Sequence, residues 1–173
     1  MKAQNIILIG PMGSGKSTIG NILAKKLSRD FQDSDHYIEK RTGVDIGRIF
    51  DIEGETGFRD RESNALKDLL SVNSRVVATG GGSVMRKENQ ALLRSKGYII
   101  FLDTSVNQQM QRLRRDKKRP LLQTDNPRER LEALFDARRS IYLELADLAV
   151  KTDHKQARKL ASEIIDQLPE HLL

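Results

Sequence analysis

The sequence contains no cysteine and no tryptophan, few aromatic residues and no long apolar run. Its 173 residues are only 5% aromatic. The absence of cysteine excludes disulfides and thiolate metal sites and agrees with a reducing compartment. No apolar run approaches the ~20 residues that a membrane-spanning helix requires, and Met1–Gln4 leads directly into an expected strand. We therefore expect a cytoplasmic protein without a membrane span or a signal peptide, formed as one domain over residues 1–173.

The chain is rich in charge, and its excess of basic residues is concentrated in one segment. It has 30 basic and 24 acidic residues and a net charge of +6. Six basic residues share a short stretch with a single acid, Asp116: Arg112, Arg114, Arg115, Lys117, Lys118 and Arg119. Such a local cluster favours binding of a specific anion over a broad nucleic-acid surface. Aromatic residues do not alternate with the basic ones, which disfavours stacking on single-stranded bases.

Three interpretations of this basic segment remain: a solvated charged surface, a nucleic-acid patch and a mobile lid over a nucleotide. The segment continues into a polar stretch, Gln123–Pro127, that is typical of a turn. An arginine carried by a closing lid stabilises the charge that develops during phosphoryl transfer. We favour a lid over approximately residues 112–126.

Short apolar runs alternate along the chain with longer amphipathic segments. This alternation predicts an α/β fold in which helices cover both faces of a parallel sheet. The expected strands are Asn5–Ile9, Phe31–Asp33, Arg75–Thr79, Tyr98–Leu102 and Leu148–Lys151. The expected helices are Lys16–Leu27, His36–Thr42, Asp45–Ile52, Glu55–Leu70, Lys87–Ser95, Val106–Arg114, Arg128–Glu144 and Gln156–Leu168. Ligands of such sheets bind beyond the carboxyl ends of the strands.

The first strand is followed by Gly10-Pro-Met-Gly-Ser-Gly-Lys-Ser-Thr18, which matches the phosphate-binding pattern G-x-x-x-x-G-K-[ST]. Glycines allow several backbone N–H groups to face one anion, and the following helix directs its positive end to the same point. We expect Lys16 to contact the β- and γ-phosphates of ATP and the hydroxyl of Ser17 to bind Mg²⁺. The other expected nucleotide contacts within the loop are Gly13, Ser14, Gly15 and Thr18.

Two carboxylates, Asp33 and Asp35, follow the second expected strand. Alternation along an extended chain points them in the same direction. One of them can bind Mg²⁺, and the other can accept a hydrogen bond from the hydroxyl that attacks the γ-phosphate. The structural alternative is that Asp35 caps the helix expected to begin at His36. The phosphate-binding loop expected at the same rim favours the functional interpretation.

Two further segments contain glycines where the backbone must approach another group closely. Gly80, Gly81 and Gly82, here called the glycine loop, follow the third strand, and three glycines in a row favour contact between backbone and ligand. Gly57-Phe-Arg-Asp-Arg-Glu62 lies within an expected helix. Its two arginines, Arg59 and Arg61, are two positions apart and cannot share a helix face. From the residues alone, a surface ion pair is the expected role of either arginine.

Taken together, these motifs resemble the bacterial type of shikimate kinase along essentially the whole chain. The resemblance depends on the following motifs in order: Gly10-Pro-Met-Gly-Ser-Gly-Lys-Ser-Thr-Ile-Gly20, Asp33-Ser-Asp35, Gly57-Phe-Arg-Asp-Arg-Glu62, Thr79-Gly-Gly-Gly82, Arg115-Asp-Lys-Lys-Arg-Pro-Leu-Leu122, and Arg138 ahead of Tyr142. It implies a three-layer α/β/α P-loop kinase fold with a mobile lid and a five-stranded parallel sheet in the order 2-3-1-4-5. It also implies transfer of the ATP γ-phosphate to the 3-hydroxyl of shikimate, on the route through chorismate to the aromatic amino acids.

The resemblance implies roles for individual residues as well. Arg59 and Arg138 would bind the shikimate carboxylate, with Arg139 as a second candidate for the role of Arg138. The glycine loop would approach the ring through backbone N–H groups, and the acceptor-binding helical segment would span approximately residues 33–62. Asp35 would hold substrate hydroxyls and act as a candidate base, and Asp33 would act on Mg²⁺ through water. The remaining implied contacts are to ATP: Arg119 at the phosphates, Arg112 at the adenine and Lys155 beside it.

The expected catalytic residues are therefore Lys16, Asp35 and Arg119, with ATP as co-substrate and Mg²⁺ as cofactor. The nearest alternative is another small-metabolite kinase, such as a gluconate kinase, which should lack the motifs at Asp33–Asp35, Gly57–Glu62 and Gly80–Gly82. A GTPase is disfavoured because no Asn-Lys-x-Asp motif is present to read guanine. We expect a monomer that binds neither nucleic acid nor membranes.

Overall fold

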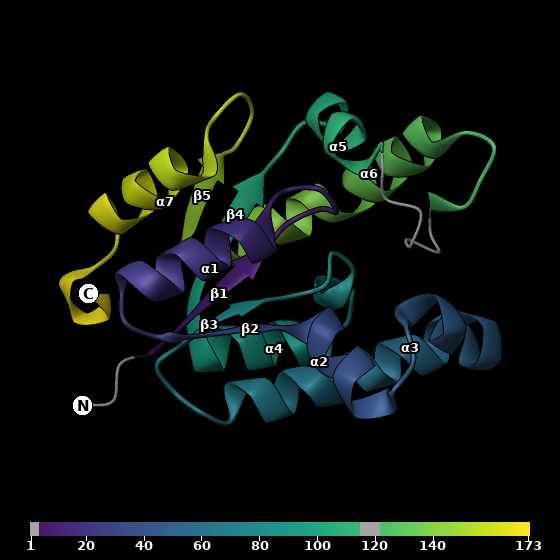
Figure 1. The fold of residues 1–173 in the computed structure, drawn as a ribbon, viewed down its shortest axis with the longest axis horizontal. Coiled ribbons are helices and arrows are strands. Elements are labelled where there is room, and N and C mark those ends of the chain that lie inside the picture. The colour runs from purple at the N-terminus through teal and green to yellow at the C-terminus, as the bar shows by residue number, and fades with distance from the viewer. Residues whose placement is uncertain (1–3, 115–121) are drawn as a thin grey trace.

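In a computed structural model, residues 4–114 and 122–173 are described, and they form one five-stranded parallel sheet between two layers of helices (Figure 1). The sheet order is β2-β3-β1-β4-β5, which confirms the order 2-3-1-4-5 that the family resemblance implies. The strands are β1 (Asn5–Ile9), β2 (Asp30–Asp33), β3 (Arg75–Ala78), β4 (Gly97–Asp103) and β5 (Leu148–Lys151).

One or two α-helices separate each described strand from the next along the chain. The α-helices are α1 (Lys16–Lys26), α2 (Ser34–Thr42), α3 (Ile46–Leu70), α4 (Lys87–Lys96), α5 (Val106–Leu113), α6 (Pro127–Leu145) and α7 (Ala157–Asp166). Two short 3₁₀ turns that the pattern does not predict are η1 (Ser83–Met85) and η3 (Glu170–Leu172). The expected strands and helices all occur, most with ends displaced by one or two residues. No described helix is long and apolar enough to cross a membrane.

The apolar run of β1 is buried on both faces of the sheet. Ile6 and Leu8 pack with α1 and α7, whereas Ile7 and Ile9 pack with α3, α4 and α6. All four side chains have no exposed surface. Successive residues of a strand point to opposite faces, so an unbroken apolar run is the pattern of a central strand covered on both sides. The phosphate-binding loop therefore begins at the rigid centre of the molecule.

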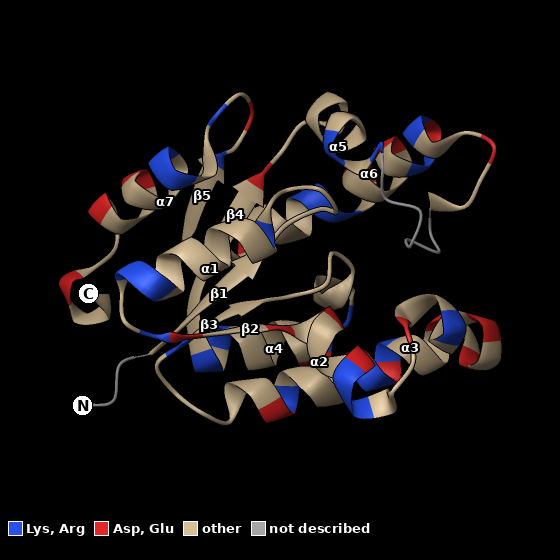
Figure 2. Ribbon diagram, viewed as in Figure 1, with Lys and Arg blue, Asp and Glu red and all other residues tan. Residues whose placement is uncertain are grey.

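The helix α3 is broken at Gly54, as the two separate helices expected over Asp45–Ile52 and Glu55–Leu70 suggest. Gly54 has φ +71° and ψ −176°, a conformation available essentially to glycine alone. The break lets the first part of α3 fold back, and Arg61 binds Glu53 through Nε and Nη2 at 2.8 and 2.6 Å. Acidic and basic residues lie side by side along α2 and α3 (Figure 2). Because acidic and basic residues are interspersed there, α2 and α3 do not form a continuous basic surface.

Candidate active site

The phosphate-binding loop lies between β1 and α1, as its sequence predicts. Gly10, Gly13 and Gly15 all have positive φ, at 147°, 74° and 88°, so the loop adopts a conformation that favours glycine at three positions. The ammonium group of Lys16 folds back over the loop and donates to the carbonyl oxygens of Gly10 and Pro11, each at 2.8 Å. The loop thus holds its lysine at the amino end of α1, where an anion is stabilised by the helix dipole.

Asp33 connects this loop to the acceptor side of the site. Its Oδ2 accepts a hydrogen bond from the Ser17 hydroxyl, and its Oδ1 accepts from the backbone N–H groups of Asp35 and His36 at 2.9 and 3.1 Å. The cap of α2 is therefore Asp33, and the alternative that assigned this cap to Asp35 is wrong. The helix begins at Ser34, so Asp35 lies in its first turn. The expected strand alternation from Asp33 to Asp35 is wrong for the same reason.

The oxygen atoms of Ser17 and Asp33 form a donor set that fits Mg²⁺. Both are hard ligands, and Mg²⁺ in phosphate-transfer sites is usually bound by one or two protein oxygens, several waters and the substrate phosphates. Within residues 4–114 and 122–173 there is no group of three or more His, Asp or Glu side chains that could hold a metal ion alone. The site thus offers part of a coordination shell beside the phosphate-binding loop.

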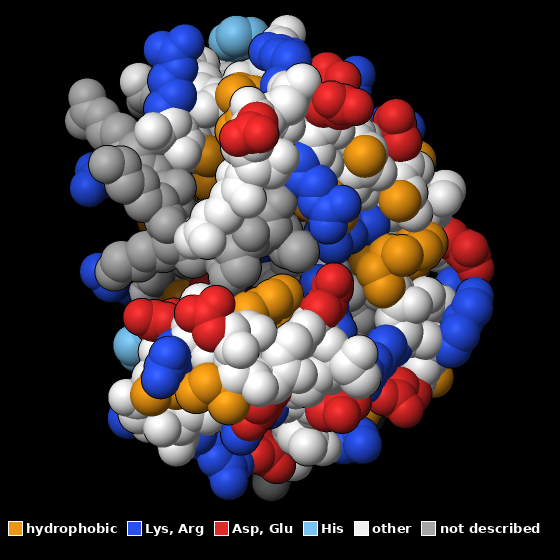
Figure 3. Space-filling view, turned by 90° about the vertical axis from the view of Figure 1, so that its right-hand side faces the viewer, with side chains coloured by type: hydrophobic (Ala, Val, Ile, Leu, Met, Phe, Trp, Pro, Cys, Tyr) orange, Lys and Arg blue, Asp and Glu red, His pale blue; other side chains and the backbone are white. Residues whose placement is uncertain are grey.

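A larger cavity of about 590 Å³ opens next to this loop between the helices α2 and α3 and Arg138 in the middle of α6. Aromatic and apolar side chains, including Met12, Ile46, Phe50 and Phe58, form part of its wall, and Asp35, Arg59, Glu62, Arg138 and the glycine loop supply polar groups. Figure 3 shows this side of the molecule, with basic side chains beside the hollow between the upper and lower parts of the view. An apolar wall with a few converging charges is typical of a site for a small polar ligand.

Two guanidinium groups from different helices face this cavity. Arg59 on α3 binds Glu62 Oε2 at 2.9 Å and Glu55 Oε1 at 3.3 Å. Burial lowers the pKa of Arg59, but these two carboxylates outweigh burial and raise its pKa overall. Arg138 on α6 is only 6% exposed, and burial, with the nearby charge of Arg59, lowers its pKa. An anionic ligand between the two arginines would relieve both the burial cost and the repulsion.

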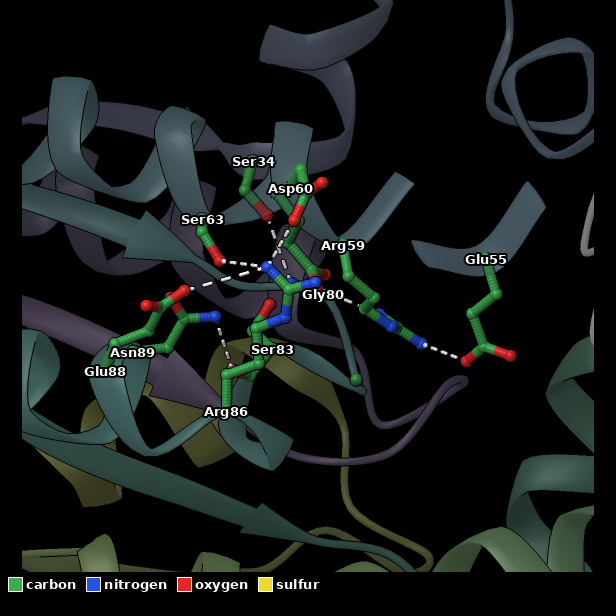
Figure 4. A network of polar contacts seen from close by, with 12 residues as sticks. Ser34, Glu55, Arg59, Asp60, Ser63, Gly80, Ser83, Arg86, Glu88 and Asn89 are labelled. Atoms are coloured by element: carbon green, nitrogen blue, oxygen red, sulfur yellow. Dashed lines mark hydrogen bonds and ion pairs between the residues drawn. The ribbon is translucent and has the colours of Figure 1, made fainter. Parts of the chain in front are cut away.

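The glycine loop is fixed in place by contacts to distant parts of the chain. The N–H of Gly80 donates to Ser34 Oγ at 3.1 Å, so the expectation that this N–H is directed at a substrate ring is wrong for this structure. A side chain at Gly82 would overlap the guanidinium of Arg59. Figure 4 shows Ser34 directed at Gly80, and Arg59 extending to Glu55. The glycines therefore serve close packing as well as any contact with a ligand.

The phosphate-binding loop and the glycine loop are direct neighbours. A smaller cavity of about 200 Å³ is lined by Lys16 and Ser17 on one side and by Asp35, Gly80 and Gly81 on the other, together with their neighbours. Asp35 lines both cavities. A phosphoryl group held by Lys16 and a hydroxyl held by Asp35 would consequently meet in one space. This proximity is what direct transfer between two bound substrates requires.

The remaining expected residues differ in what they contact around these cavities. Arg112 donates to the Gly13 carbonyl at 3.0 Å and so lies against the phosphate-binding loop. Lys155 is ion-paired to Glu163 at 2.7 Å. Arg139 is bound to Asp103 at 3.0 Å and is largely exposed, and it does not line the cavity that contains Arg138. Arg119 and the rest of residues 115–121 of the expected lid lie outside the described residues.

Sequence reasoning missed several residues that shape the site. The motif Asp33-Ser-Asp35 assigns no role to Ser34, yet this residue is fully buried and its hydroxyl holds the glycine loop. The apolar wall formed by Ile46, Phe50 and Phe58 was not anticipated either. Helical periodicity shows that such side chains are apolar, but it does not show which of them border a cavity. The one signal for Ser34 in the sequence is its position between two carboxylates that are expected to be functional.

Comparisons with known proteins agree with this fold and with the family that the motifs resemble. The family model described as shikimate kinase matches residues 12–169. A shikimate kinase of Vibrio cholerae serotype O1 is 51% identical over 170 residues, which cover 98% of each protein, and one of Vibrio parahaemolyticus is 53% identical over 167 residues, covering 96% of this chain and 97% of the relative. Among solved structures, a shikimate kinase from Acinetobacter baumannii in complex with shikimate has a TM-score of 0.93 and 44% identity, with 96% of both chains covered.

Proposed function

The chain belongs to the shikimate kinase family and is a kinase that phosphorylates shikimate with ATP; we propose that its P-loop binds ATP and that the larger cavity binds shikimate. The product is shikimate 3-phosphate, a precursor of the aromatic amino acids. The observation that best supports this assignment of the two sites is the pair of guanidinium groups, Arg59 and Arg138, in a cavity that adjoins the phosphate-binding loop.

Arg59 and Arg138 bind the carboxylate of shikimate. Arginine presents its N–H groups in a planar arrangement that matches the two oxygens of a carboxylate. Because Arg59 is already paired with Glu62, its orientation is set before the substrate arrives. The charge of Arg138 is offset less by nearby carboxylates than the charge of Arg59 is. Burial therefore lowers the pKa of Arg138 and disfavours its charged form. The arriving carboxylate supplies the missing charge. Gly81 and Gly82 line the same cavity as the two arginines and border the ring of the substrate there.

Asp35 binds the shikimate hydroxyl that attacks the phosphate. As the bond forms between this oxygen and the γ-phosphorus, the bond from that phosphorus to the β-phosphate oxygen breaks and ADP leaves. The hydroxyl proton passes to the Asp35 carboxylate, which is positioned between the two cavities. A positioned general base contributes about 10²–10⁴-fold to the rate of such a reaction.

The P-loop residues Gly13–Thr18 bind the phosphates of ATP, and Lys16 lies nearest to the transferred group. Ser17 directly, and Asp33 through water, would hold Mg²⁺, and the ion would supply positive charge to neutralise the phosphate oxygens. Arg119 contacts the phosphates from the lid, Arg112 lies beside the adenine, and Lys155 is near it. The Arg119 assignment derives from the family resemblance, since this residue lies outside the described part of the chain. The protein acts as a cytoplasmic monomer.

An assay of ADP release with shikimate and gluconate in parallel tests this function. We expect Mg²⁺-dependent release with shikimate and background release with gluconate, because gluconate lacks the ring that fits beside the glycine loop. Addition of excess EDTA should abolish the activity, and excess Mg²⁺ should restore it. Equal turnover of the two acids, or faster turnover of gluconate, would contradict the proposed function.

A further inference from the structure

Tyr142 is a fully buried residue of α6, one helical turn after Arg138. Its ring stacks on Phe101 of β4, with 5.0 Å between ring centroids and 25° between the planes. This ring lies in the apolar cluster that α3, α4 and α6 form against the sheet. A phenylalanine would pack in the same way, so the core by itself does not require a hydroxyl here. A buried tyrosine hydroxyl needs a polar partner, and that partner is in the proposed acceptor site.

The hydroxyl of Tyr142 donates to the carbonyl oxygen of Gly81 at 2.5 Å. The segments that carry these two groups are 61 residues apart in sequence. Gly81 is the middle residue of the glycine loop, whose preceding residue, Gly80, is held by Ser34 on the side of α2. The loop is therefore fixed at one position by α2 and at the next by α6.

The same hydroxyl lies near the guanidinium of Arg138, because both groups lie against Gly81. This proximity favours the charged form of the arginine and opposes the effect of burial on its pKa. A tyrosine hydroxyl has one proton and two acceptor positions. Since the proton is donated to Gly81, the lone pairs of the oxygen remain available to stabilise the nearby charge of Arg138. A side chain added at Gly81 would lie 3.5 Å from Arg138 Nη1, so the three groups meet at one point.

We propose that Tyr142 is a positioning residue whose hydroxyl fixes the Arg138 guanidinium and the Gly81 carbonyl relative to each other, and so aligns two elements of the acceptor site. This inference depends on the proposed function, in which both elements contact shikimate. It explains why a hydroxyl is present where the core needs only a ring. Tyr142 itself does not contact the substrate in this account.

The hydroxyl keeps its proton throughout the neutral pH range. Burial raises the pKa of Tyr142 to about 12, although the positive charge of Arg138 opposes this rise. The hydrogen bond to Gly81 thus remains formed at any pH at which the enzyme is assayed. A role in positioning therefore predicts no new ionisation in the pH profile, in contrast to a role in proton transfer.

The variant Tyr142→Phe removes the hydroxyl and keeps the ring that stacks on Phe101. We expect the KM for shikimate to rise about tenfold, because the variant leaves the buried Gly81 carbonyl without its donor and removes the hydroxyl beside Arg138. The kcat and the KM for ATP should stay within about twofold of wild type. Tyr98→Phe is the matched control, because Tyr98 is partly buried near the start of β4 and lies outside both cavities. It should leave all three constants unchanged.

A second measurement asks whether Tyr142 acts through Arg138. If it does, Tyr142→Phe should raise the KM for shikimate much less in an Arg138→Lys background than in the wild type, because residues that act as a unit are not additive. An unchanged KM in Tyr142→Phe, or equal losses in both backgrounds, would overturn the proposal. A parallel loss of kcat, ATP affinity and thermal stability would also overturn it and leave a purely structural role. Wild-type failure to phosphorylate shikimate would instead contradict the proposed function.

Discussion

The phosphate-binding loop and the acceptor cavity are built in opposite ways. The loop consists of consecutive residues, Gly10–Thr18, and its lysine is held by carbonyl oxygens of the same loop. The acceptor cavity draws Arg59, Gly80 and Arg138 from three distant segments. Arg59 is held by Glu62 of its own helix, whereas Gly80 is held by Ser34 of α2. The contrast shows that the donor half of the site is a local property of the sequence, whereas substrate selection depends on the tertiary structure.

If the two halves are separable in this way, changes in the acceptor cavity should alter the use of shikimate and leave ATP binding intact. Asp35 is the most demanding case because it lines both cavities. We expect Asp35→Asn to lower kcat at least ~10²-fold while ATP affinity, measured by equilibrium binding, stays near the wild-type value. A near-normal kcat would remove Asp35 from the chemistry. A parallel loss of ATP binding would show that the two halves are not separable.

The neighbouring residues Arg138 and Arg139 provide a smaller but sharper test. Arg138→Ala removes a buried cation from the cavity and should lower kcat/KM for shikimate about 30-fold, the scale of a charge-assisted hydrogen bond. Arg139→Ala is the matched control, because its side chain is largely exposed and paired with Asp103. Steady-state kinetics of both variants decide the assignment. A larger effect for Arg139 would mean that the cavity in this structure is not the acceptor site.

The smallest expected effect concerns Ser34, which touches the backbone of the glycine loop. Ser34→Ala leaves the buried N–H of Gly80 without its acceptor, and we expect a roughly fivefold rise in the KM for shikimate as the loop shifts. The KM for ATP should be unchanged. Ser63→Ala is the control, since Ser63 is also buried and, among residues 4–114 and 122–173, its hydroxyl accepts a long hydrogen bond from Arg86 at 3.5 Å. Equal effects of the two changes would mean that Ser34 has no specific role at the site.

The same contrast explains how much of the protein the sequence predicts. The phosphate-binding loop and its flanking strand and helix follow from residue spacing, because every contact involved is local. The sheet order and the pairing of Arg59 with Arg138 come from family resemblance, since spacing along the chain does not reveal which distant residues meet. The cap formed by Asp33 and the hydrogen bond from Tyr142 to Gly81 were not anticipated, because each depends on where a neighbouring element ends or packs.

Recognition of a carboxylate by two arginines from separate helices is the central claim, and an uncharged substrate analogue tests it most directly. The measurement is the ratio of kcat/KM for shikimate to that for its carboxamide, in the wild type and in Arg138→Ala. We expect the wild type to prefer the acid by a large factor and Arg138→Ala to lose most of that preference, with an unchanged KM for ATP. The same preference in both proteins would contradict the account.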